Sequence, residues 1–184
     1  GARPIVPQIP GVDQDGVFTL RSLRDAAAIR EALSGGVAKD VYIIGGGLVG
    51  ITTAEELLAT GARITILEKK DYVLLRLFDS DIADRIQLGL NKRGVKVRTG
   101  VEITGIERHE RGLRIHTPDE VFGADLVVIS AGVTPNVDLA RDAGLDIGTS
   151  GGIIVNECLQ TTDEAVYAVG DCAESNNIVT RSEE

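Results

Sequence analysis

Three glycines, Gly45, Gly47 and Gly50, stand in the spacing G-x-G-x-x-G within the stretch IIGGGLVG. The stretch follows an apolar run and opens a segment with helical periodicity. In a strand–turn–helix setting, the first glycine permits a sharp turn and the second lets a pyrophosphate come against the backbone. The third lets the helix pack closely on the strand. The pattern therefore predicts a site for a dinucleotide.

Backbone N–H groups at the start of the expected helix would attract the phosphates. We expect Gly46, Leu48 and Val49 to contribute with the motif glycines, because first-turn N–H groups lack an intrahelical partner and lie at the positive end of the helix dipole. The dipole itself contributes about 0.3–1 kcal/mol, so most of the affinity must come from hydrogen bonds to the charged acceptor. A glycine-rich turn that serves only the packing of the chain would show the same motif. The motif on its own therefore does not decide between phosphate binding and packing.

An acidic residue adds to the motif. Glu68 ends the second apolar run, RITILE, eighteen residues after Gly50. A carboxylate at that place accepts hydrogen bonds from the adenosine ribose. A 2′-phosphate at ~4 Å from it would be repelled by about 4 kcal/mol per charge pair at an effective dielectric constant of ~20. Lys69 and Lys70 follow and could soften this repulsion, and Lys69 is one of the expected cofactor-binding residues, but lysine clamps a phosphate less well than arginine does. We therefore expect NAD(H) rather than NADP(H).

The elements that must position these residues can be read from periodicity and from turn residues. Ser22 and Asp25 resemble a helix capping box, and residues 34–36 would end that helix. The continuous apolar run over 124–132 suits the buried middle of a parallel sheet. The patterns predict helices at 21–33, 48–60 and 80–94, strands at 40–45, 63–68, 124–132, 152–156 and 165–169, and short antiparallel strands over 95–117 with a turn at 110–112.

Two of these helices have apolar positions at helical spacing. In the helix expected at 21–33, one side should carry apolar residues. In the helix expected at 80–94, three apolar residues recur at steps of four, and Gly94 is expected to end the helix. These positions are Leu23, Ala27, Ile29 and Leu33 in the first helix, and Ile82, Ile86 and Leu90 in the third. The order strand–helix–strand predicts an α/β fold with a Rossmann-like βαβ unit and a small antiparallel meander.

Composition excludes several kinds of partner. The 184 residues are 43% hydrophobic, enough for a globular core, and 22 glycines amount to about 12% against a usual ~7%. A net charge of -9 and an aromatic content of 3% argue against nucleic acid. No apolar run reaches the ~20 residues needed to cross a bilayer, so we expect a cytoplasmic protein without a membrane partner.

Cysteine and histidine do not suggest a metal site. Cys158 and Cys172 lie fourteen residues apart, in neither a redox nor a zinc-ligand spacing. We expect two buried, structural thiols. His109 and His116 flank the expected turn, with no further histidine or cysteine at ligand spacing. No metal is expected.

Four motifs in order resemble the FAD-dependent pyridine nucleotide-disulfide oxidoreductases. They are GARPIVPQIPGV, VYIIGGGLVGITTAEELLATGARITILEK, ISAGVTPNVDLARDAGL and GGIIVNECLQTTDEAVYAVGDCAE. The similarity is greatest to the branch with NADH oxidases, coenzyme A-disulfide reductases, nitrite reductase large subunits and rubredoxin or ferredoxin reductases. In that family a flavin domain is interrupted by an NAD(H)-binding domain and followed by an interface domain.

The resemblance implies that the chain is a fragment. Residues 1–17 would end the first FAD segment, 18–132 would form the NAD(H)-binding domain, and 133–184 would begin the second FAD segment. The flavin fingerprint and the interface domain that forms a homodimer would lie elsewhere in the full-length protein. The isolated fragment is expected to bind NADH without turning it over, and the sequence does not reveal the electron acceptor.

The resemblance also assigns residues. Gly45, Gly47 and Gly50 would hold the NAD pyrophosphate and Glu68 the ribose. Ala131 and Gly132 would lie beside the nicotinamide, and Asp171 would contact the flavin ribityl chain or its phosphate in the full-length protein. Leu48 stands where many members have a tyrosine over the flavin, and Thr52 where many have a glutamate, so the nicotinamide end departs from the family pattern.

Two alternatives remain open. The chain could be a stand-alone nucleotide-binding module without redox chemistry. The glycines could instead bind the ADP part of FAD, because the two fingerprints are chemically the same; the order of the motifs favours NAD(H), since the flavin fingerprint should precede GARP.

Overall fold

The computed structural model describes residues 1–34, 39–110 and 112–175. The chain divides into two compact units, one formed by Pro4–Gly132 and the other by Gly1–Arg3 with Val133–Glu184. The assignment of 1–17, 18–132 and 133–184 to flavin and NAD(H) domains stays a prediction.

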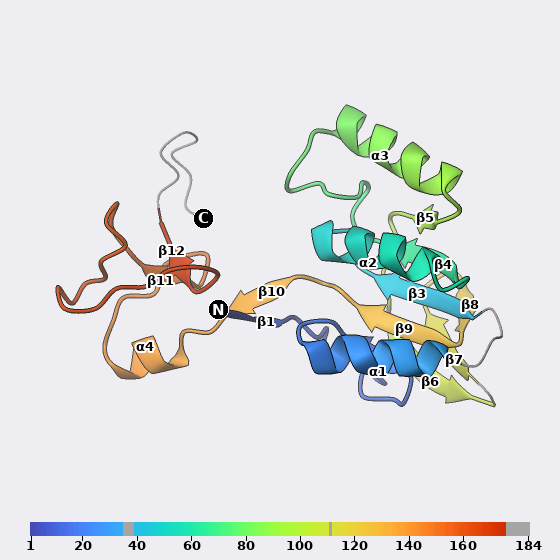
Figure 1. The fold of residues 1–184 in the computed structure, drawn as a ribbon, viewed down its shortest axis with the longest axis horizontal. Helices are drawn as coiled ribbons and strands as arrows, with labels where there is room; N and C mark the ends of the chain where they lie inside the picture. The colour runs from blue at the N-terminus through green and yellow to red at the C-terminus, as the bar shows by residue number, and fades with distance from the viewer. Residues whose placement is uncertain (35–38, 111, 176–184) are drawn as a thin grey trace. The chain divides into compact units, whose positions relative to one another are not determined.

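The Pro4–Gly132 unit is built on a five-stranded parallel sheet (Figure 1). Its strands, in spatial order, are β2 (Val17–Thr19), β9 (Leu126–Ile129), β3 (Asp40–Ile44), β4 (Arg63–Leu67) and β5 (Lys96–Arg98). The helices are α1 (Leu23–Leu33), α2 (Leu48–Leu58) and α3 (Ser80–Lys92). The predicted βαβ unit is therefore present as β3–α2–β4, with β3 and β4 paired in parallel.

A second, antiparallel sheet belongs to the same unit. It consists of β6 (Gly105–His109), β7 (Gly112–His116) and β8 (Val121–Ala124), paired in that order. His109 is the register partner of Gly112, and the turn between them contains a residue outside the described ranges. The predicted α/β fold with a small antiparallel meander is confirmed.

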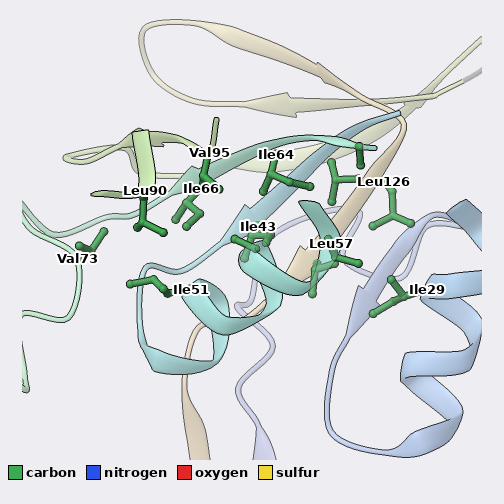
Figure 2. Packing of buried hydrophobic residues seen from close by; sticks show 14 of the residues in the cluster. Ile29, Ile43, Ile51, Leu57, Ile64, Ile66, Val73, Leu90, Val95 and Leu126 are labelled. Carbon is green, nitrogen blue, oxygen red and sulfur yellow. The ribbon is translucent and has the colours of Figure 1, made fainter. Parts of the chain in front are cut away.

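The two faces of the parallel sheet bury different partners. Successive strand residues point to opposite faces. On one face, Ile43, Ile66 and Val128 are fully buried with side chains of α1, α2 and α3, as Figure 2 shows for much of this cluster. On the other face, Leu67 and Val127 pack against the antiparallel sheet. The unit is thus three layers, with helices on one face and the meander on the other, and β9 is buried on both.

Helix α1 begins as expected but buries less than expected. The Ser22 side chain accepts from the Asp25 N–H at 3.2 Å, and Asp25 accepts in return from the Ser22 N–H at 2.8 Å. Ile29 is buried, whereas Leu23 and Ala27 are exposed, so the predicted apolar side was partly wrong. Helix α1 packs against β2, an edge strand of the sheet. The expected glycine stop after Ser34 falls outside the described residues.

Two of the expected strands were wrong. Lys96–Arg98, expected to be antiparallel, pairs in parallel with β4 as the edge of the main sheet. An exposed edge strand alternates apolar and polar residues in the same way as a meander strand, so the pattern could not separate them. Ala165–Val169 forms no strand; within it, Tyr167 takes part in an isolated bridge with Gln160.

The second unit is small and rich in turns. It contains β1 (Ala2–Pro4, whose last residue is grouped with the other unit), β10 (Val133–Pro135), α4 (Asp138–Asp142), β11 (Ile153–Ile154) and β12 (Ala173–Glu174). Cys158 is exposed and Cys172 is partly exposed, so the expectation of two buried thiols was wrong. Among the described helices of the chain, none is long and apolar enough to cross a membrane.

Candidate functional site

The glycine motif forms the turn between β3 and α2. Strand β3 ends at Ile44 and α2 begins at Leu48. The Gly45 N–H donates to the Leu67 carbonyl of β4 at 2.8 Å, and the Ser130 N–H donates to the Ile44 carbonyl at 2.8 Å. The turn therefore lies at the carboxyl ends of three adjacent parallel strands, where open α/β sheets bind their ligands.

Two of the motif glycines are required by the packing of the protein itself. Gly45 has a φ of 115°, in the left-handed region, and a β-carbon there would overlap the Ser130 carbonyl and lie 3.3 Å from the Ala131 nitrogen. A β-carbon on Gly50 would overlap the Gly45 carbonyl oxygen and lie 3.4 Å from Ile43 Cγ2. The first and third glycines thus permit the sharp turn and the close packing of helix on strand.

Gly47 is different, because no protein atom explains it. It is the N-cap of α2, with extended backbone, and a β-carbon on it would meet nothing within 4 Å. No side chain caps the helix, and the following Leu48 and Val49 are 60% and 47% exposed. The start of α2 thus has open space beside Gly47 and exposed side chains after it, as a cradle for an anion requires.

Glu68 lies against this turn. Its Oε2 accepts a hydrogen bond from the Gly46 N–H at 2.5 Å, and its Oε1 accepts one from the Lys70 N–H at 2.8 Å. The residue follows directly after β4 and is part-buried. The carboxylate predicted to grip a ribose is therefore brought together with the glycine turn.

Gly46 is occupied on both sides, which the sequence did not suggest. Its N–H is taken by Glu68, and its carbonyl accepts from the Leu74 N–H at 2.9 Å. A β-carbon on it would lie 2.8 Å from Val73 Cγ1. Its predicted cofactor role stays a prediction, and that role would come through the shape of the turn rather than its N–H group. The sequence offered one sign of this arrangement: a third glycine, Gly46, stands between Gly45 and Gly47 at a position for which the motif does not require glycine.

The remaining predicted residues of this unit surround the turn. The Lys69 ammonium pairs with Glu102 at 2.5 Å. Ala131 and Gly132 follow β9 and are exposed, and the Gly132 carbonyl accepts from the Ile5 N–H at 2.9 Å. Thr52 is exposed on α2 and donates back to the Leu48 carbonyl at 3.0 Å.

Asp171 belongs to the other unit. It is exposed in the turn that precedes β12, where the Ala173 N–H donates to the Gly170 carbonyl at 2.9 Å. That placement also suits a residue with a purely local role in the turn, and its predicted contact with a flavin stays a prediction.

Glu174, three residues later, is a buried carboxylate that the sequence reasoning missed. Only 5% of it is exposed. Its Oε2 accepts from the N–H groups of Ser150 at 3.0 Å and Gly152 at 3.1 Å, and also from the Ser150 hydroxyl. Burial raises the pKa of Glu174, but these hydrogen bonds outweigh that effect and hold the pKa below its ordinary value. The glycines that crowd around it, Gly148 and Gly152, were the available signal.

Comparison with known proteins identifies the family. The sequence profile described as "pyridine nucleotide-disulphide oxidoreductase" matches residues 1–183. The chain belongs to this family.

Relatives of the family cover almost all of the chain. The CoA-dependent NAD(P)H sulfur oxidoreductase of Pyrococcus abyssi is 41% identical over 180 residues, which are 98% of this chain and 40% of that protein. The structure of an NAD-dependent persulfide reductase from A. fulgidus matches with a TM-score of 0.94 and 36% identity, over 100% of this chain and 34% of the other. The chain thus spans about 40% of the length of the curated relatives.

Two related structures contain pyridine nucleotides. The water-forming NADH oxidase from Lactobacillus brevis, bound to NADH, matches with a TM-score of 0.92 and 29% identity, over 100% of this chain and 40% of the other. An engineered, NADPH-bound mutant of that enzyme matches with a TM-score of 0.91 and 29% identity, over the same shares. The family is therefore one that uses FAD and pyridine nucleotides, and the comparisons do not choose between NAD and NADP.

Proposed function

We propose that residues 18–132, which lie within the Pro4–Gly132 unit, are the NAD(H)-binding domain of an FAD-dependent oxidoreductase and that they position NADH for hydride transfer to the flavin. The observation that carries this proposal is the environment of Gly47. A β-carbon there would meet no protein atom, so packing within the chain does not require a glycine at this position, and the space beside it is open to a group that comes from outside. A pyrophosphate that approaches the backbone needs such open space.

The donors for the pyrophosphate are the first N–H groups of α2. Gly47, Leu48 and Val49 lie at the start of this helix, which has no side-chain cap. Hydrogen bonds from backbone N–H groups to a charged acceptor are about twice as strong as neutral ones. Glu68 would accept hydrogen bonds from the adenosine ribose, while Ala131 and Gly132, at the end of β9, would lie beside the nicotinamide.

The cofactor is NAD(H) rather than NADP(H). A 2′-phosphate on the ribose would come close to the Glu68 carboxylate, with a repulsion of about 4 kcal/mol per charge pair at ~4 Å and an effective dielectric constant of ~20. The adjacent Lys69 ammonium is already paired with Glu102, which weakens its attraction for a phosphate. The cation nearest in sequence therefore offsets little of the repulsion.

The flavin would supply the redox chemistry when bound, by accepting a hydride from the nicotinamide. This chain's residues bind and orient. Asp171 would contact the flavin ribityl chain or its phosphate, and the other flavin contacts would come from parts of the full-length protein outside this sequence. We expect that protein to be a cytoplasmic homodimer. The chain alone should bind NADH without oxidising it.

Calorimetric titration of the 184-residue chain with NADH, NADPH and FAD tests this proposal. We expect NADH to bind one site per chain, NADPH to bind at least tenfold more weakly, and FAD to bind more weakly than NADH. Equal affinity for NADPH would contradict the role given to Glu68 in selection. A yellow purified chain that retains FAD at Gly45–Gly50 would show instead that the glycines bind a flavin nucleotide.

A further inference from the structure

Gly46 and Glu68 form a contact that exists without any ligand. The Gly46 N–H points at Glu68 Oε2, with a nitrogen–oxygen distance of 2.5 Å. The absence of a side chain on Gly46 leaves room for this contact, because a β-carbon would lie 3.1 Å from the same oxygen and 3.2 Å from Glu68 Cβ. A side chain at position 46 would therefore crowd Glu68, as well as Val73, whose Cγ1 would lie 2.8 Å from the β-carbon.

Glu68 is itself held by the main chain on both sides. Its backbone N–H donates to the Arg98 carbonyl at 2.9 Å, and its carbonyl accepts from the Val101 N–H at 2.9 Å. Its second carboxylate oxygen accepts from the Lys70 N–H at 2.8 Å. The side chain thus starts from a fixed backbone and has two charge-assisted hydrogen bonds that limit its rotation.

The opposite side of Gly46 is held in a similar way. Its carbonyl accepts from the Leu74 N–H at 2.9 Å, and Val73, which is fully buried, lies against it. Leu74 has a φ of 55°, which is unusual for a residue with a large side chain. The turn is therefore fastened at one glycine from two directions.

We propose that Glu68 is a positioning residue for the phosphate-binding turn, in addition to its role toward the ribose. By holding the Gly46 N–H, the carboxylate fixes the direction in which the N–H groups of Gly47 and Leu48 point before a dinucleotide arrives. A carboxylate has about four acceptor positions, so Glu68 can keep this bond while it accepts a ribose hydroxyl. The inference rests on the proposed function because it describes how the same site is preorganised.

The possible roles of Glu68 predict different effects of its removal on the binding of a dinucleotide that lacks the ribose hydroxyls. A residue that acted only on the ribose would lose its effect on an NADH analogue with a 2′,3′-dideoxy adenosine ribose. A residue that only repelled phosphates would, on losing its charge, improve the binding of that analogue. A positioning residue should weaken the binding of the analogue when it is removed, because the phosphate donors lose their common direction.

Titration of the dideoxy analogue into three variants separates these roles. We expect Glu68→Ala to bind the analogue at least fivefold more weakly than the unmodified chain does. Glu68→Gln should lose threefold or less, since its amide oxygen can still accept from Gly46. The matched control is Glu102→Gln, which removes a neighbouring negative charge without touching the turn, and it should bind equally well or slightly better. Unchanged or tighter binding of the analogue to Glu68→Ala would overturn the proposal.

A measurement without ligand separates this proposal from the proposed function. In the amide NMR spectrum, the Gly46 proton should be shifted downfield and exchange slowly with solvent. Both properties should be lost in Glu68→Ala, partly kept in Glu68→Gln and unchanged in Glu102→Gln. If they persist in Glu68→Ala, the positioning role is wrong even where NADH binds. If both properties are lost in Glu68→Ala but the unmodified chain binds no dinucleotide, the proposed function is wrong. The contact then shapes the turn, but the proposal that it prepares a dinucleotide site is wrong too.

Discussion

Gly45 and Gly50 meet backbone to backbone, with the Gly45 carbonyl oxygen in the space where a β-carbon on Gly50 would stand. The oxygen belongs to a turn that is hydrogen-bonded to β4 through the Gly45 N–H, so it cannot easily move aside. The helix α2 can approach the sheet this closely only while position 50 is glycine.

Gly50→Ala should therefore lower the free energy of unfolding by about 2–3 kcal/mol, as expected for overpacking against backbone. Urea unfolding followed by helical circular dichroism would measure this, because α1, α2 and α3 all belong to the Pro4–Gly132 unit. Gly89→Ala is the control. It lies within α3 with nothing within 4 Å of its β-carbon, and it should raise the free energy by about 0.5–1 kcal/mol. Equal effects of the two variants would contradict the steric explanation.

Gly47→Ala should separate binding from stability. A β-carbon there meets nothing within 4 Å, so the free energy of unfolding should fall by less than about 1 kcal/mol, the cost of a poorer N-cap. The affinity for NADH should fall about tenfold or more, because the methyl group would occupy the space of the pyrophosphate. Calorimetric titration measures the affinity, with Gly89→Ala as the variant that should bind normally. Undiminished binding by Gly47→Ala would remove the main support for the site.

Glu174 should make the stability of its unit depend on pH. Its pKa is below the ordinary value in the folded state, so its contribution is present at pH values above the unfolded pKa and is lost as the pH falls through the folded one. Glu174→Gln should cost about 1–3 kcal/mol at neutral pH, typical of losing hydrogen bonds to a charged acceptor. The difference from the unmodified chain should shrink steadily below about pH 4.5, the ordinary pKa of a glutamate side chain. Urea titrations monitored by the amide signals of Ile153 and Val155 would follow this, and a difference that does not vary with pH would refute it.

Leu159 offers a way to stabilise the second unit. Its backbone has a φ of 63°, in the left-handed region, which is unfavourable for a large side chain. The side chain is 41% exposed, so its burial offsets only part of that strain. Asparagine tolerates this conformation better, and Leu159→Asn should raise the free energy of unfolding by about 0.5–1 kcal/mol. Leu139→Asn, at an exposed site within helix α4, should lower it by a few tenths of a kcal/mol. The amide signals of Ile153 and Val155 under urea report both, and a loss of stability in Leu159→Asn would mean that its side-chain packing outweighs the backbone strain.

The sequence predicted the elements best where local signals agree. The Ser22–Asp25 capping box forms as expected, and the apolar run that includes Val128 is the buried middle of the parallel sheet. The capping box depends on residues close in sequence, and the apolar run reflects burial on both faces of one strand. The order of the strands in a sheet depends on neither of these, so the sequence assigned Lys96–Arg98 to the wrong partner strands.

For the site, the motif predicted the positions of the glycines but not the reasons for each of them. Gly45 and Gly50 serve internal packing, while Gly47 has no neighbour that a side chain would strike. The contact between Gly46 and Glu68 depends on the path of the chain after β4, which places Val73 and Leu74 behind the turn. A contact between residues this far apart in the sequence produces no periodic pattern of residue types, so the sequence could not predict it.

The position of β9 has a consequence for biosynthesis. This strand lies between β2 and β3 and pairs with both, although Val127 follows its partner Val17 by 110 residues and Leu126 follows its partner Val41 by 85. A ribosome therefore releases both neighbours long before their shared partner exists, and the newly made strands wait with unsatisfied edges until residue 129 has emerged. Pairing over such a separation is slow and exposes the nascent chain to aggregation. Truncations of this gene upstream of β9 should accumulate as insoluble or chaperone-bound polypeptide, however intact the glycine turn that they encode.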